Sequence, residues 1–266
     1  MARNDDFKDL IYILVNTRDH YVISNGITFP GFIQSLKKPL ANLLLLKHKY
    51  DDTEFHLDTQ LDYILKDQVE QLIRKGVHKF GEFCWVDFDD VFSLDTIEGE
   101  ELAELLYLGH MKKHLSLPFF QKLNNRFAYL TEDDGWLNKT YYRYWTDFYD
   151  CLGGILASRL SEAKYDKSII GFRKKKIYPP IERNVLHQLN SLLTEGLVFS
   201  FQHFSQERGQ IEIPFWVVGD YYDMDEMMEK YLAVSTADVP HGNIVFDRKQ
   251  KEWQVNLNKN GNLKVR

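Results

Sequence analysis

Four aspartates lie directly after two apolar runs of the sequence, where an active site could use their side chains. Asp87 and Asp89 follow the run CWV, and Asp220 and Asp223 follow the run FWVVG. Short apolar runs of this kind are typical of buried strands, so each pair of acids is expected at the end of a strand. Carboxylates can bind divalent cations, transfer protons or attack as nucleophiles. These four residues are therefore the first candidates for chemistry.

The arrangement resembles the first and fourth motifs of the haloacid dehalogenase-like phosphohydrolases. In that family an Asp-x-Asp follows a core strand, and later acids in a Gly-Asp-x-x-x-Asp-like pattern complete a magnesium site. The resemblance implies that Asp87 is the phosphoryl-accepting nucleophile and that Asp89 is the general acid and base. It also implies that Asp220 and Asp223 hold Mg²⁺, which would neutralise the phosphate charge during the attack.

Two further residues extend the resemblance. Thr131, at the end of FAYLT, matches the phosphate-binding Ser or Thr of the second motif, and Lys174 or a neighbour matches the Lys of the third. The chain departs from the pattern at Asp90, where Gly is usual, and its first motif lies far from the chain start. The family also has a parallel sheet, whereas the strands expected near the C-terminus look locally antiparallel. The magnesium-dependent phosphohydrolase is therefore the alternative interpretation, and no cofactor is expected without it.

A basic cluster forms the other candidate binding site. It consists of Arg173, Lys174, Lys175 and Lys176 and precedes Tyr178-Pro179-Pro180. Charge runs are usually solvated, and proline disfavours helix before it, so the segment 164–180 is predicted to be an exposed connector or an internal boundary. Binding of RNA or a phospholigand by residues 173–176 is a weaker alternative. A formal net charge of -6 argues against nucleic-acid binding through the general field of the protein.

The chain has no segment that resembles a membrane span or a secretory signal. An acidic run precedes the first short apolar segment, and the most apolar run, PLANLLLLKHKY, is interrupted by Lys47 and His48. Only Cys84 and Cys151 are present, and their spacing fits neither a zinc ribbon nor a disulfide framework. A soluble, cytoplasmic protein with reduced thiols is expected.

The periodicity of apolar residues predicts the fold class. Apolar spacings of three and four favour helices, and alternation favours strands. Helices are expected at about 31–49, 59–75 and 139–163, and strands at about 82–88, 126–131 and in a hairpin at 243–257. The predicted fold is therefore α+β or mixed α/β, with a helical N-terminal third packed on a small mixed sheet that ends in a C-terminal β-hairpin. Residues 1–266 are expected to form a single domain.

The aromatic content and the missing motifs together favour a binding function. The chain contains 18 Phe, 15 Tyr and 5 Trp, and aromatic stripes such as that of Trp145 and Phe148 are usually packed in a core. No phosphate-cradling loop, dinucleotide fingerprint, nucleophile elbow or HExxH motif occurs. We therefore expect a non-catalytic binding or regulatory module with a protein partner, no membrane association and no nucleic acid.

Overall fold

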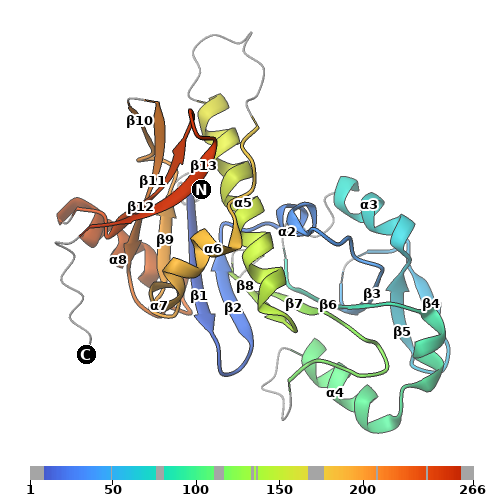
Figure 1. Ribbon diagram of the computed structural model, residues 1–266. Coiled ribbons are helices and arrows are strands. Elements are labelled where there is room, and N and C mark those ends of the chain that lie inside the picture. The colour runs from blue at the N-terminus through green and yellow to red at the C-terminus, as the bar shows by residue number, and fades with distance from the viewer. Residues whose placement is uncertain are drawn as a thin grey trace. The chain divides into compact units, whose positions relative to one another are not determined.

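The structure is a computed structural model with thirteen strands among its described residues (Figure 1). These residues are 9–48, 50–75, 81–110, 117–132, 135, 137–166, 177–207, 209–237 and 239–258. Every strand pairing found there is antiparallel. Contacts divide the chain into two compact units: a continuous unit, Asn16–Phe148, and a discontinuous unit, which combines Met1–Val15 with Tyr149–Arg266.

The continuous unit is built on seven strands in the order β2-β8-β7-β6-β3-β5-β4. Their bounds are β2 Tyr21–Asn25, β8 Leu137–Tyr142, β7 Phe127–Glu132, β6 Phe83–Phe88, β3 Asn42–Lys47, β5 Leu61–Ile64 and β4 Glu54–His56. The helical segments are α2 (Phe29–Ser35), α3 (Lys66–Lys75), the 3₁₀ helix η1 (Val91–Thr96) and α4 (Gly99–Gly109). Both α3 and α4 contact β3, so this inner strand is covered by helices.

An aromatic cluster forms the core between α2 and the strands β6 and β7. Phe29 of α2 lies 5.2 Å from the ring centroid of Trp85 on β6 and 5.5 Å from that of Tyr129 on β7. Trp85 and Tyr129 are stacked, with centroids 5.1 Å apart and planes 7° apart. Phe32 packs on both of these rings. Because large rings bury much apolar surface, this cluster supplies a major part of the stability of the continuous unit.

The discontinuous unit has the strand order β13-β12-β11-β9-β1, with β10 paired to β11. Its strands are β1 Leu10–Asn16, β9 Leu197–Ser200, β10 Ser205–Glu207, β11 Gln210–Val217, β12 Gly242–Asp247 and β13 Glu252–Leu257. Its helices are α5 (Trp145–Asp166), which begins in the continuous unit, α6 (Arg183–Leu186), η3 (His187–Leu189), α7 (Asn190–Leu193) and α8 (Met224–Ala237). Strand β1 pairs with β9 from Leu10↔Ser200 to Ile13↔Leu197, so this unit joins segments from far apart in the sequence.

A buried tyrosine joins the loop between β11 and α8 to β1. The Tyr12 hydroxyl donates to the Gly219 carbonyl at 2.9 Å and accepts the Tyr221 N–H at 2.9 Å. Burial raises the pKa of Tyr12 above its usual range. The neutral hydroxyl therefore serves as a structural donor and acceptor.

Helix α5 approaches the backbone of the segment before α6 very closely at Gly153. The Gly153 carbonyl accepts the Ile181 N–H at 3.2 Å. Close by, Arg183 forms an ion pair with the buried carboxylate of Asp150. The missing side chain at Gly153 thus allows two backbones to meet where a charged pair also holds them.

The expected helical N-terminal third is wrong, because the chain begins with strands. The range 31–49 contains only the short α2 before β3, and the range 59–75 contains β5 before α3. Strand β3 lies between β5 and β6 and is mostly buried, so its leucines form a continuous apolar run that also fits helical spacing. The small mixed sheet is likewise replaced by antiparallel strands in both units.

The helix expected at 139–163 begins later, at Trp145. Residues 139–142 belong to β8, which pairs with β2 and β7. Thr140, Tyr141 and Tyr142 are β-branched or aromatic, which favours a strand when partners lie on both sides. Phe148 is buried, whereas Trp145 is half-buried and stacks on His20 with centroids 5.3 Å apart.

Several sequence-based expectations are confirmed. The predicted strands at 82–88 and 126–131 correspond to β6 and β7, and the terminal hairpin corresponds to β12 and β13. The single domain remains a prediction, as does the connector at 164–180, because residues 167–176 lie outside the described residues.

The close approach at Gly153 makes a specific prediction. A Cβ added there would lie 2.2 Å from the Ile181 carbonyl oxygen, whereas a Cβ at Gly99, the first residue of α4, meets nothing within 4 Å. We expect Gly153→Ala to lower the free energy of unfolding by about 1 to 3 kcal/mol, because a backbone has to move. Gly99→Ala should be neutral or stabilising by up to about 1 kcal/mol. Urea denaturation of both variants would show equal midpoints if the contact at Gly153 were not restrictive.

Candidate functional site

The proposed nucleophile Asp87 is a buried structural acceptor. Its side chain is 5% exposed, and its Oδ1 accepts the N–H groups of Arg126 at 2.9 Å and Phe127 at 2.7 Å. Burial raises the pKa of Asp87 to about 7, against the opposing effect of these two N–H groups and of the Arg126 charge. The carboxylate thus closes the end of the β6–β7 pairing, whose last registered pair is Val86↔Ala128.

The other three aspartates of the predicted magnesium site have separate surroundings. Asp89 is exposed and accepts the Asn124 side-chain amide at 2.6 Å. Asp223 accepts the N–H groups of Asp225 and Glu226 and so caps the start of α8. Asp220 is exposed in the same loop. Asp87 and Asp89 belong to the continuous unit and the other two to the discontinuous unit.

The remaining predicted phosphate ligands do not form a described site. Thr131 is buried, and its hydroxyl donates to the Gly81 carbonyl at 2.9 Å and accepts the Phe83 N–H at 3.0 Å. Its hydrogen-bonding capacity is therefore used by the strand end. The basic cluster of Arg173, Lys174, Lys175 and Lys176 lies outside the described residues.

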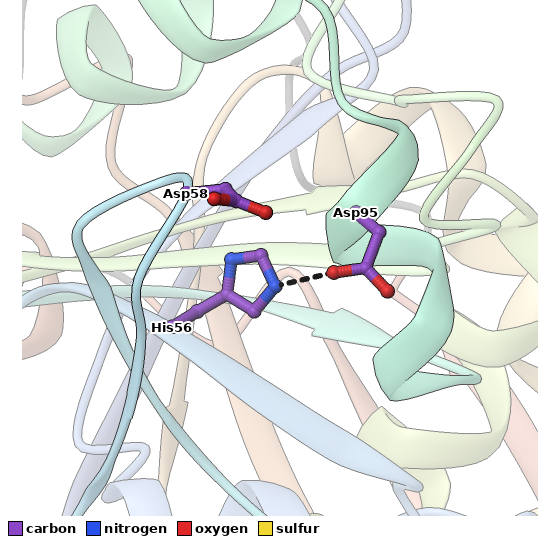
Figure 2. Close-up of side chains that lie close together, drawn as sticks. All are labelled: His56, Asp58 and Asp95. Carbon is purple, nitrogen blue, oxygen red and sulfur yellow. Dashed lines mark hydrogen bonds and ion pairs between the residues drawn. The ribbon is translucent and has the colours of Figure 1, made fainter.

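A group of potential metal ligands occurs elsewhere in the continuous unit. His56, Asp58 and Asp95 each offer a ligand atom, and these atoms lie within 4.8 Å of one another. Figure 2 shows the three side chains pointing toward one another, two from the β4–β5 hairpin and one from η1. His56 Nε2 and Asp95 Oδ1 are 3.0 Å apart. It is the one group of three such side chains found among the described residues.

The hairpin turn fixes the orientation of the His56 ring. Residues 57–60 join β4 to β5, and Gln60 adopts the left-handed conformation with φ 55°. The Gln60 N–H donates to the His56 carbonyl at 2.8 Å and closes the turn. On the ring, Nδ1 lies 3.0 Å from the Thr59 hydroxyl oxygen and accepts the Thr59 N–H at 3.3 Å. With Nδ1 held by a buried Thr59, Nε2 is directed at Asp95.

The third ligand is positioned by the end of β6. The chain leaves this strand at Phe88, and Asp90 caps η1 by accepting the Phe92 N–H at 3.1 Å. Asp95 follows within η1, and its side chain is 56% exposed, compared with 12% for His56. A mostly buried imidazole therefore meets an exposed carboxylate, whose side chain can change rotamer.

The two partners of the His56 ring give it two alternative hydrogen-bonding states. When Nδ1 accepts from Thr59, the neutral ring carries its proton on Nε2 and donates it to Asp95. If the proton moves to Nδ1, that nitrogen gives up the Thr59 N–H and donates to the Thr59 hydroxyl, so that Nε2 carries a lone pair and can bind a cation between Asp58 and Asp95. Metal-binding histidines are usually oriented in this way, by a group that accepts a hydrogen bond from the ring nitrogen that does not bind the metal.

Neither a family model, a curated protein nor a solved structure matches the chain. The described residues contain no helix that combines the length and the apolarity needed to cross a membrane.

The structural role of Asp87 can be tested by two substitutions. Asp87→Ala removes the acceptor of two buried N–H groups and should lower the free energy of unfolding by about 2 to 4 kcal/mol. Asp87→Asn keeps an oxygen in the same place and should cost less than about half as much. Chemical denaturation at neutral pH measures both. Equal stability of the alanine variant and the wild type would contradict the structural role.

The raised pKa of Asp87 also predicts a pH dependence of stability. An unfolded Asp has a pKa of about 3.9, and the folded value is about 7, so the folded state binds this proton more tightly. The resulting stabilisation is fully present below about pH 4 and is lost as the pH rises to about 7. Between about pH 4 and pH 7, the free energy of unfolding of the wild type should fall relative to that of Asp87→Asn. Above about pH 7 the difference between the two proteins should stay constant. A constant difference across the whole range would disprove the shift.

Proposed function

We propose that this protein is a non-catalytic binding module that holds a divalent transition-metal ion with His56, Asp58 and Asp95. The observation that carries the proposal is the mutual distance of at most 4.8 Å between their ligand atoms. A cation bound by all three would tie the β4–β5 hairpin to η1. Binding at this place therefore provides a regulatory means of ordering one edge of the continuous unit.

The geometry and charge of the group support such an ion. Bonds of about 2.1 Å at tetrahedral angles place ligand atoms about 3.4 Å apart, which is close to the 3.0 Å between His56 Nε2 and Asp95 Oδ1. Asp58 is exposed, so its side chain can close the remaining distance by rotation. Two carboxylates also balance the charge of a divalent cation, which lowers the cost of partial desolvation.

The ligand set favours Zn²⁺ or a similar ion over Mg²⁺ and Ca²⁺. An imidazole nitrogen suits zinc, copper, iron and nickel, whereas magnesium and calcium prefer oxygen ligands throughout. Three protein ligands leave a coordination position for water or for a side chain of a partner. Zn²⁺ is therefore the appropriate probe.

The phosphohydrolase alternative receives less support. The resemblance requires a parallel sheet, but β6 and β11, the strands that precede the two pairs of acids, have antiparallel neighbours. It also requires an accessible nucleophile, whereas Asp87 is buried and accepts two backbone N–H groups. RNA or phospholigand binding by residues 173–176 has no described contact to support it.

A reducing compartment such as the cytoplasm fits the proposed module. Cys84 and Cys151 are both buried thiols. Burial raises the pKa of the Cys84 thiol above its usual range, which keeps it protonated and unreactive.

Isothermal titration with Zn²⁺ tests the proposed ion site. The wild type should show a saturable site, and His56→Gln or Asp95→Asn should weaken it by about tenfold or more, because each removes a ligand. The Asp95 side chain is largely exposed, and Gln keeps polar atoms at position 56, so the variants should keep the wild-type circular dichroism spectrum.

His48→Gln is the matched control for this experiment. His48 Nε2 lies 2.9 Å from Asp62 Oδ2 in the same unit, but no third ligand is grouped with this pair among the described residues. The control should bind Zn²⁺ like the wild type. The proposal is wrong if all the variants bind equally, or if His48→Gln weakens binding as much as His56→Gln.

A further inference from the structure

Three large apolar side chains are exposed around the β4–η1 contact. Phe55 and Leu57, in and after β4, are 55% and 80% exposed, and Phe92 of η1 is 76% exposed. Side chains three apart in a 3₁₀ helix lie on the same side, so Phe92 shares the side of η1 that carries Asp95. Since His56 contacts Asp95, alternation along β4 places Phe55 on the other face of the strand. Apolar groups thus lie on both faces of one strand edge.

The same two segments carry a strong negative charge. Residues 51–58 and 89–100 contain no lysine or arginine. Their acidic residues, all exposed, are Asp51, Asp52, Glu54, Asp58, Asp89, Asp90, Asp95, Glu98 and Glu100. Lys75 and Lys122 reach in from neighbouring segments to contact Asp52 and Glu98. The net charge of this surface remains negative, so it attracts cationic groups.

Strand β4 also offers backbone groups for pairing. It pairs with β5 from Glu54↔Tyr63 to His56↔Leu61 and is the last strand in the order of its unit. The described residues place no strand along its other side. An edge of this kind can accept an added strand, whose alternate side chains then contact the two faces separately.

We propose that the β4–η1 surface, formed by residues 51–58 and 89–100, docks an extended basic segment of a protein partner. The segment adds a strand to β4. Its lysine or arginine side chains lie on the face that carries His56, beside Phe92, and meet the carboxylates there, while its apolar side chains alternate with them and contact Phe55 on the other face. This interaction goes beyond the ion site, because none of its parts requires a bound cation.

Charge decides between this occupant and two others. A second copy of the chain would bring the same carboxylates against this surface, and like charges on an edge strand oppose such pairing. A nucleic acid would bring phosphates against them, which is equally unfavourable. A positively charged polypeptide with apolar side chains satisfies all three features of the surface.

Fluorescence anisotropy with a labelled peptide that alternates Lys and Val tests the proposal. The buffer contains EDTA, so that a failure of cation binding cannot affect the result. The wild type should bind this peptide, with an affinity that falls as salt is added. A matched peptide that alternates Glu and Val should bind at least about tenfold more weakly, since its charges are repelled.

Two independent variants locate the binding surface. The double substitution Phe55→Ser and Leu57→Ser and the charge reversal Glu54→Lys should each weaken binding of the basic peptide by about tenfold. All three positions are exposed, so the fold is retained. Leu232→Ser, on an exposed residue of α8, is the control and should bind like the wild type. The proposal is overturned if the two peptides bind equally, or if the surface variants bind like the control.

Discussion

A buried carboxylate determines where strands β6 and β7 of the continuous unit stop pairing. Asp87, near the end of β6, accepts the N–H groups of Arg126 and Phe127 at the start of β7. Arg126 in turn forms a two-point ion pair with Asp147 in the first turn of α5. Because β6 ends beside this group, η1 can begin at once and carry Asp95 to the hairpin. The candidate ion site therefore depends on a carboxylate that takes no part in it.

The strands that sequence patterns identified share one property. In β6, β7 and the terminal hairpin, β-branched and aromatic residues are bounded by clear turn residues, so the periodicity has one interpretation. Strand β3 lacks this clarity, because Leu43, Leu44 and Leu45 are all buried and a buried run fits a helix equally well. The aromatic pair Tyr141 and Tyr142 is similarly ambiguous in sequence, because its place in a strand depends on pairing with β2 and β7.

Sequence patterns do not predict the candidate site, for a different reason. His56 and Asp58 are two residues apart, but such a pair is too common to indicate a metal, and nothing in the pattern relates it to Asp95. That relation is a tertiary contact created by the strand order β6-β3-β5-β4. Asp87 shows the converse, since the sequence places it correctly near a strand end, yet its role follows from the backbone of residues 126 and 127. Phe55, Leu57 and Phe92 would likewise be assigned to a core from their types alone.

The discontinuous unit has a consequence for synthesis on the ribosome. All strands of the continuous unit have emerged once residue 142 has left the exit tunnel, so its sheet can form early. Strand β1 is made before every strand of the continuous unit, but its partner β9 begins only at Leu197. The apolar residues Leu10 to Val15 must therefore remain unpaired with β9 while residues 17–196 are translated. Nascent chains arrested before residue 197 are consequently the species most in need of a chaperone.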